Sequence, residues 1–234
     1  MRIGILQCDD VMESLQPAHG NYPEMLTQLL REQDPALEIE LYPAHLGRLP
    51  GALDECDGYV TTGSRYGVTD GLPWIEALRD FVVELHGARH KLVGICFGHQ
   101  MMAAALGGEV QKSDKGWGVG LSFNDILAQK PWMQPFKPSL DLIVSHQDQV
   151  TRLPEGAEVL ASSRFCPYYM VQYDEHFLGV QGHPEFCKAY SCDLMQARRG
   201  SVIPEVRVRE GLASLSGEVD DKLMMAWIVR FLAG

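Results

Sequence analysis

The sequence has no apolar run long enough to cross a membrane, since a spanning helix needs about 20 consecutive apolar residues. Its six cysteines include no C-x-x-C pair, which argues against a zinc cage or a disulfide framework and predicts free thiols. Basic side chains are scarce: 20 Lys and Arg stand against 31 Asp and Glu, and the formal net charge is −11. Such a charge repels phosphate backbones and anionic lipids, so we expect neither nucleic acid nor a membrane as partner.

Other features are also missing. The N-terminal stretch MRIGILQCDD lacks the length and the small-residue cleavage site of a secretory signal, which predicts a cytoplasmic protein. There is no internal repeat and no G-x-x-x-x-G-K-[ST] phosphate loop. The composition is otherwise that of an ordinary folded protein, and we expect a single domain over residues 1–234. Its catalytic core is expected at about 1–190 and its C-terminal helices at about 185–234.

Apolar runs and amphipathic stretches alternate over the first hundred residues, which predicts an α/β fold. We expect a three-layer sandwich in which helices cover both faces of a mostly parallel central sheet. Later strand patterns predict antiparallel additions to this sheet, and the tail is expected to be helical except over 201–218. The predicted strands are residues 2–8, 37–44, 58–62, 91–96, 116–123, 140–146, 157–163, 168–174 and 177–184. The predicted helices are residues 21–33, 73–86, 98–108, 186–200 and 220–234.

A cysteine lies between two glycines where a predicted strand passes into a predicted helix, in KLVGICFGHQ. Gly94, Cys96 and Gly98 match the pattern G-x-nucleophile-x-G, in which a sharp turn holds the central side chain above a sheet. The positive end of the following helix favours a thiolate, and its free N–H groups can stabilise an oxyanion. Taken alone, this short pattern also fits a buried packing cysteine.

A candidate base follows a later apolar strand, in FLGVQGHPEF. A cysteine nucleophile needs a base, and the base needs an orienting group. His183 lies just past the strand, and Glu185 two residues on can fix its tautomer and stabilise the imidazolium. Taken alone, His-Pro-Glu fits a loop histidine and an acid at a helix start. The presence of both patterns favours an acyl-transfer site.

The stretches GICFGHQ and GVQGHPE, in this order, resemble the motifs of the class I glutamine amidotransferases. The resemblance covers most of the chain, from Ile3 to Glu185, and includes YVTTGS and IVSHQDQV. It implies the flavodoxin-like fold of that family and a triad of Cys96 as nucleophile, His183 as general base and acid, and Glu185 as orienting carboxylate. No metal or organic cofactor is needed for the implied reaction.

The resemblance also implies roles for the residues around the triad. The N–H groups of Gly63 and Phe97 would form the oxyanion hole. Gln100, Ser145 and His146 would hold the α-amino and α-carboxylate groups of a glutamyl substrate. Gln100 lies one helical turn past the nucleophile, which puts both on the same helix face. Without the resemblance, SHQDQV would be taken for a polar strand end.

Some neighbouring residues receive no role. Helical geometry points His99 away from the nucleophile, so we expect it to be structural, and we assign no chemistry to Cys8. Arg65, Tyr66 and Asp70, in GSRYGVTDGLPW, could recognise the far end of a substrate but fit ordinary surface residues equally well.

The implied reaction is acyl transfer at a γ-glutamyl carbonyl through a thioester on Cys96. The stretch SDKGWGVG resembles stand-alone members similar to γ-glutamyl peptidases and to the glutaminase domain of GMP synthetase, so we predict a hydrolase of glutamine or γ-glutamyl peptides. One alternative is a glutaminase subunit that delivers ammonia to a separate synthetase partner. Others are a non-catalytic binding protein, which has no need of a complete triad, and a redox chaperone, which has no use for Glu185.

Overall fold

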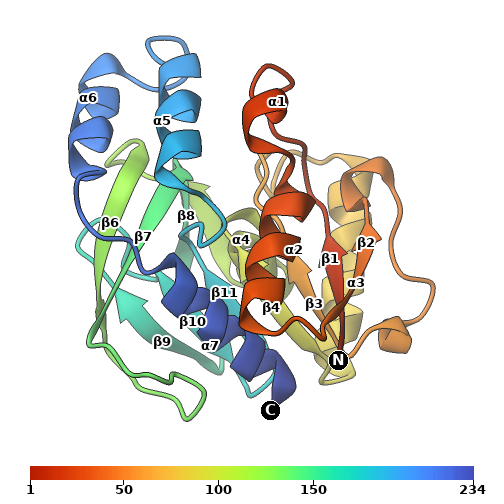
Figure 1. Ribbon diagram of the computed structural model, residues 1–234. Helices are drawn as coiled ribbons and strands as arrows, with labels where there is room; N and C mark the ends of the chain where they lie inside the picture. The colour runs from red at the N-terminus through yellow and green to blue at the C-terminus, as the bar shows by residue number, and fades with distance from the viewer.

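A nine-stranded sheet runs through the molecule with helices packed on both faces (Figure 1), and the computed structural model describes all residues 1–234. The strand order is β2-β1-β3-β4-β11-β10-β9-β6-β7, and β5 and β8 form a separate two-stranded sheet. The strands are β1 (Arg2–Leu6), β2 (Glu38–Tyr42), β3 (Gly58–Thr61), β4 (Lys91–Ile95), β5 (Glu109–Lys112), β6 (Gly118–Ile126), β7 (Ser139–His146), β8 (Asp148–Arg152), β9 (Ala157–Ser162), β10 (Met170–Tyr173) and β11 (Phe177–Val180). The helices are α1 (Gln16–His19), α2 (Tyr22–Gln33), α3 (Pro73–Gly87), α4 (Phe97–Ala105), α5 (Lys188–Ala197), α6 (Glu205–Ser214) and α7 (Asp221–Ala233), with short 3₁₀ turns at Ala44–Leu46 and Leu53–Glu55.

The large sheet has a parallel part and an antiparallel part. Strands β2, β1, β3, β4 and β11 pair in parallel. Strands β10, β9, β6 and β7 continue the sheet with antiparallel pairing. The predicted α/β fold class is therefore confirmed, together with the prediction that the later strands extend the same sheet. Parallel pairing brings the carboxyl ends of β1, β3, β4 and β11 to one edge, where ligand sites of such sheets lie.

Two apolar layers hold the helices against the sheet. Successive strand residues face opposite sides, so Val93 packs in the layer shared with α2 and α7, whereas Leu92 packs in the layer shared with α3 and α4. Trp227 of α7 is fully buried in the first layer. Because both faces are covered, β3, β4 and β11 are buried along almost their whole length, as parallel strands of such sheets are.

Four elements were not predicted from the sequence: the short helix α1, helix α6 and strands β5 and β8. Helix α6 occupies Glu205–Ser214, inside the segment expected to be irregular. It forms because it packs on β6: the Ser214 hydroxyl accepts a hydrogen bond from the Leu121 N–H at 2.8 Å, and a Cβ on Gly120 would lie 2.5 Å from the carbonyl oxygen of Gly211. Strands β5 and β8 were not predicted either, because they are short, partly polar segments that become strands only by pairing with each other.

Candidate active site

The candidate nucleophile lies in a sharp turn between β4 and α4, at the carboxyl edge of the parallel strands. The backbone of Cys96 has φ 50° and ψ −95°, a conformation that costs a non-glycine residue about 1–3 kcal/mol. Both flanking glycines are sterically required. A Cβ on Gly94 would lie 2.5 Å from the carbonyl carbon of Gly98, and a Cβ on Gly98 would lie 1.7 Å from Oγ1 of Thr61. The strand and helix therefore approach as closely as a nucleophile elbow demands.

The thiol of this elbow meets both a polar side chain and a helix start. Cys96 is only 5% exposed, and Nε2 of Gln181 donates a hydrogen bond to its Sγ at 3.4 Å. The N–H of Phe97, the first residue of α4, makes no hydrogen bond within the chain. A helix N-terminus with free N–H groups beside a thiol favours negative charge at this point.

The candidate base and its orienting acid follow β11. Nδ1 of His183 and Oε1 of Glu185 are 2.7 Å apart, and both side chains are buried. The backbone N–H of His183 donates to the carbonyl oxygen of Ile143 at 2.8 Å, which ties the loop to β7. The ring of Phe186 stacks on the imidazole with 3.9 Å between centroids and an interplanar angle of 13°. The imidazole is thus held in one orientation by a carboxylate, a backbone bond and an aromatic face.

The charge state of the imidazole follows from the groups around it. Burial lowers the pKa of His183, whereas the negative charges of Glu185 and Cys96 and their hydrogen bonds raise it, and the net result is a pKa of about 10. At neutral pH the ring is therefore an imidazolium. Strands β11 and β4 pair in parallel with Val180 opposite Ile95, and the N–H of Cys96 donates to the carbonyl oxygen of Val180 at 2.8 Å, so the elbow and the loop of His183 leave the sheet side by side. Cys96, His183 and Glu185 thus form one cluster, although the first lies far from the other two along the chain.

The predicted oxyanion donors border this cluster. Gly63 follows β3, and a Cβ there would lie 2.6 Å from Cε1 of His183, so only glycine fits against the imidazole. The hydroxyl of Thr62 donates to the carbonyl oxygen of Gly63 at 3.0 Å and accepts from the N–H of Cys8 at 2.8 Å, which fixes the loop. The N–H of Gly63, like that of Phe97, makes no hydrogen bond within the chain. Both donors are free for a substrate oxygen.

The predicted substrate-binding residues line a cavity of about 550 Å³ that also contains the nucleophile. Nε2 of Gln100 is occupied, since it donates to the Asp148 carbonyl oxygen at 2.8 Å and to Oε1 of Gln181 at 3.1 Å. The hydroxyl of Ser145 and Nε2 of His146 are buried without a partner. Burial lowers the pKa of His146 to about 4, so this ring is neutral near pH 7. The structure thus brings all three residues to the cavity, where the Ser145 hydroxyl and His146 Nε2 have no hydrogen-bond partner within the chain.

Sequence reasoning missed Gln181, which links the nucleophile to Gln100. It is completely buried directly after β11. The available signal was its position two residues before His183, in GVQGHPE, where a polar residue interrupts an apolar run. Such a residue, buried beside a candidate base, must have its hydrogen-bonding groups satisfied within the site.

Other histidines lie outside the triad. His99 is completely buried against Gly179, and burial lowers its pKa to about 3, in agreement with a structural role. His86, Asp174 and His176 have ligand atoms within 4.8 Å of one another and are the group that could hold a metal ion. They lie beside the first residues of β4, because the His176 carbonyl accepts from the Leu92 N–H, and Cys96 is at the other end of that strand.

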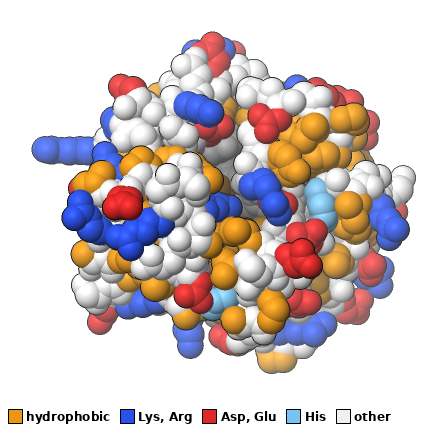
Figure 2. Space-filling model, turned by 90° about the horizontal axis from the view of Figure 1, so that it is seen from above, with side chains coloured by type: hydrophobic (Ala, Val, Ile, Leu, Met, Phe, Trp, Pro, Cys, Tyr) orange, Lys and Arg blue, Asp and Glu red, His pale blue; other side chains and the backbone are white.

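Several charged side chains form part of the cavity wall. Figure 2 shows acidic and basic side chains around a hollow on this face of the molecule. Its charged lining residues are Asp10, Arg65, Asp70, Lys112, Asp148 and Arg198. The volume is within the range of about 300–1,000 Å³ typical of small-molecule sites. The cavity therefore extends well beyond the triad, into a region that can recognise charged groups.

The family model described as "Glutamine amidotransferase class-I" matches residues 20–190. The chain therefore belongs to the class-I glutamine amidotransferase family. Gamma-glutamyl peptidase 3 of Arabidopsis thaliana is 32% identical over 189 residues, covering 77% of this chain and 74% of the relative. Gamma-glutamyl peptidase 5 of the same plant is 38% identical, covering 74% and 71%. The glutamine-hydrolyzing GMP synthase of Sulfolobus acidocaldarius has a subunit that is 38% identical over 134 residues, covering 57% and 69%.

Solved structures share the fold over the whole chain. A glutamine amidotransferase from Thermotoga maritima superimposes with a TM-score of 0.77 at 18% identity, covering 100% of this chain and 99% of that one. A glutamine amidotransferase from Methylobacillus flagellatus gives 0.72 at 19% identity, with 100% and 94% covered. At this identity the likeness supports the fold alone. No helix in the structure has the length and apolar character needed to span a bilayer.

Proposed function

We propose that this protein hydrolyses a γ-glutamyl amide bond, in glutamine or a γ-glutamyl peptide, through a thioester on Cys96. The observation that carries the proposal is the cluster of Cys96 in a strained elbow beside a buried His183–Glu185 pair of 2.7 Å. A binding protein would have no use for a strained cysteine next to an imidazolium, and strain of this kind is typical of functional sites. Membership in the amidotransferase family supports the same reaction class.

The reaction divides into two steps. The Cys96 thiolate attacks the γ-carbonyl carbon, and the N–H groups of Gly63 and Phe97 stabilise the oxyanion, each contributing about 3 kcal/mol. The imidazolium of His183 then gives its proton to the departing amine as the carbon–nitrogen bond breaks. A water molecule, deprotonated by the now neutral His183, attacks the thioester and releases glutamate and the Cys96 thiolate. Glu185 orients the ring and stabilises its charged form throughout.

The size of the cavity favours a free-standing hydrolase of γ-glutamyl compounds larger than glutamine. A cavity of about 550 Å³ extends past the nucleophile to a second set of polar residues, whereas glutamine alone would leave this outer part without a contact. Relatives named gamma-glutamyl peptidase match about three quarters of the chain and support the same substrate class.

The second candidate is a glutaminase subunit that supplies ammonia to a separate synthetase partner. The specific support for it is the likeness to relatives that are named as single subunits of GMP synthase. In that case the isolated chain would release little glutamate from glutamine until its partner is added. The two candidates share the triad. They differ only in the amine that leaves the γ-glutamyl carbonyl and in what receives it afterwards.

The test is glutamate release from glutamine and from γ-glutamyl dipeptides by the purified chain, with Cys96→Ala as the inactive control. Activity on dipeptides with little on glutamine supports the peptidase. Glutamate release from glutamine that depends on added cell extract supports the second candidate. If neither substrate class is hydrolysed under either condition, while the wild-type protein is folded, the hydrolase proposal is wrong.

A further inference from the structure

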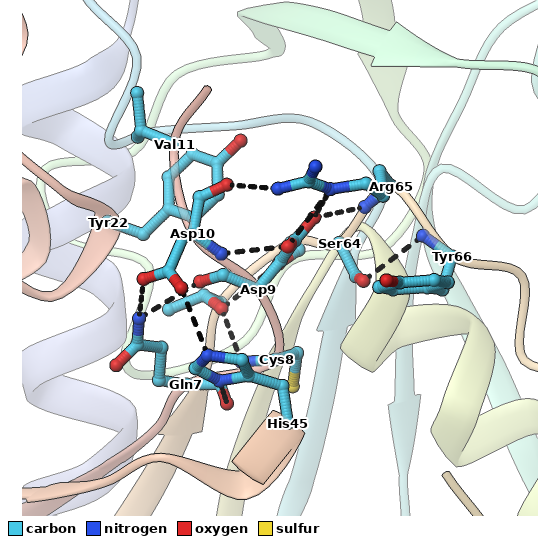
Figure 3. Close-up of polar contacts among 12 residues, drawn as sticks. Gln7, Cys8, Asp9, Asp10, Val11, Tyr22, His45, Ser64, Arg65 and Tyr66 are labelled. Atoms are coloured by element: carbon cyan, nitrogen blue, oxygen red, sulfur yellow. Dashed lines mark hydrogen bonds and ion pairs between the residues drawn. The ribbon is translucent and has the colours of Figure 1, made fainter. Parts of the chain in front are cut away.

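Arg65 lies on the cavity wall, in the loop that begins with the candidate oxyanion donor Gly63. Its backbone N–H donates to Oδ2 of Asp9 at 2.8 Å, and Nε donates to the same oxygen at 2.8 Å. Asp9 itself is only 4% exposed and follows β1. A buried carboxylate therefore holds both the backbone and the guanidinium of one arginine, and Figure 3 shows the pair spanning the ends of two strands.

The tip of this guanidinium, formed by Nη1 and Nη2, is largely free of contacts within the chain. Nη2 donates one hydrogen bond to the carbonyl oxygen of Asp10 at 2.9 Å, and Nη1 makes no hydrogen bond within the chain. Two of the five N–H groups of the guanidinium are thus used, one on Nε and one on Nη2, which leaves three at the tip. The Arg65 side chain is 48% exposed, so these three groups are accessible from the cavity. A fixed guanidinium with a free tip is suited to a carboxylate.

The neighbouring acid does not neutralise this tip. The carboxylate of Asp10 accepts hydrogen bonds from Gln7 at 2.7 Å and Asn21 at 2.6 Å on Oδ1, and Oδ2 is 3.1 Å from Nε2 of His45. These contacts turn the Asp10 side chain toward three other residues, of which Figure 3 labels Gln7 and His45, and only the Asp10 backbone oxygen accepts from Arg65. A second cation, Arg198, lines the same cavity, and its side chain makes no hydrogen bond within the chain.

The loop that carries Arg65 indicates on which side of the nucleophile this side chain lies. Gly63, two residues earlier, packs directly against the imidazole of His183, the group that gives its proton to the leaving amine. The free polar atoms of Ser145 and His146, in contrast, belong to the end of β7. A γ-glutamyl peptide placed with its amide nitrogen toward His183 therefore directs its leaving amine toward the loop of Arg65.

Resting on the proposed hydrolase function, we propose that Arg65 binds a carboxylate on the leaving amine. The preferred substrates are then γ-glutamyl peptides that end in a free α-carboxylate, and glutamine, whose leaving group is ammonia, cannot use this contact. Asp9 acts as a positioning residue, because it orients the guanidinium without contacting the substrate. Neither Arg65 nor Asp9 belongs to the triad.

The test compares γ-glutamylglycine with γ-glutamylglycinamide, which differ only in the terminal carboxylate. Wild-type protein is expected to hydrolyse the acid with a kcat/KM about 10-fold higher than the amide, since a half-exposed charge-assisted contact is weakened by solvent. In Arg65→Ala this ratio is expected to fall to about one, mainly through a higher KM for γ-glutamylglycine. Arg209→Ala is the matched control: Arg209 is exposed, lies outside the cavity and should keep the wild-type ratio.

A second variant covers the case in which Arg65→Ala does not fold because Asp9 is left buried and unpaired. In Asp9→Asn/Arg65→Ala the unpaired charge is gone, and the loss of preference for the acid is expected again. If a folded variant loses kcat/KM equally for γ-glutamylglycine and γ-glutamylglycinamide, the proposal is overturned. Arg65 would then act on the glutamyl part of the substrate or on the loop. An unchanged ratio also overturns it. Wild-type protein that hydrolyses neither substrate overturns the proposed function itself, before any substitution is made.

Discussion

Two cysteines follow buried parallel strands of the same sheet, yet their surroundings differ completely. Cys8 follows β1: it is fully buried, its thiol donates to the carbonyl oxygen of Leu6, and burial raises its pKa. Cys96 follows β4, where the chain turns through a positive φ into a helix. It also meets an imidazolium and the amide of Gln181. A strand end therefore does not make a nucleophile; the turn and the partners from distant segments do.

The largest expected effect separates these two cysteines by activity. Cys96→Ala removes the attacking atom and should lower kcat/KM for a γ-glutamyl substrate by about 10⁴-fold or more. Cys8→Ala should change it by less than about threefold, because that thiol contacts only the protein interior. The measurement is glutamate release under identical conditions. A comparable loss in both variants would show that the β1 end takes part in the chemistry and would remove the contrast.

The second largest effect is expected from Glu185, the carboxylate in the cluster around Cys96. Glu185→Gln removes the negative charge that favours the imidazolium, and kcat/KM should fall by about 10²–10³-fold. In the wild type, activity should decline on the alkaline side as His183 loses its proton with a pKa of about 10. The alkaline decline should move to lower pH in Glu185→Gln, because the main group that raises this pKa is gone.

The raised pKa of His183 also makes the stability of the fold depend on pH. Because the folded-state pKa of His183 is raised from 6.5 to about 10, its ion pair stabilises the fold fully below pH 6.5. This stabilisation is lost as the pH rises through about 10. The control is Glu155→Gln, an exposed carboxylate, which should leave both the pH–rate profile and the melting temperature unchanged. An alkaline decline at the same pH in wild type and Glu185→Gln would contradict the assignment of His183.

The smallest expected effect tests the elbow itself. Gly98→Ala would place a Cβ 1.7 Å from Oγ1 of Thr61, so the strand and helix must separate, and stability should fall by about 3 kcal/mol. Gly87→Ala, at the end of α3, meets nothing within 4 Å and should cost no stability, since alanine favours the helix. Chemical denaturation measures both. Equal stability of the two variants would mean that the β4–α4 turn is not tightly packed.

Local sequence patterns predicted most of the fold. Strand β4 and helix α4 follow from an apolar run, a pair of glycines and a helical stretch within the single segment KLVGICFGHQMMAAALGG. Helix α6 could not be found in this way, because its few apolar residues show no clear stripe and its stability comes from the contact with β6. The strands β5 and β8 were missed for the same reason, since each depends on a partner far along the chain.

The candidate site divides in a similar way. The motifs around Cys96 and His183 were evident in the sequence, and the structure places both with Glu185, Gly63 and Phe97. The contact of Gln181 with the thiol was not predictable, because it depends on the packing of β11 beside β4. Nor did the sequence distinguish Arg65 from an ordinary surface residue.

The sequence by itself determined most of the strands and helices, the elbow at Cys96 and the stiff His-Pro-Glu turn, since each depends on backbone preferences of neighbouring residues. Tertiary structure alone decided that a buried carboxylate at position 9 would hold the arginine at position 65, and that residue 181 would reach the nucleophile. The physical reason is that these contacts join segments brought together only by parallel strand pairing, which no local periodicity encodes.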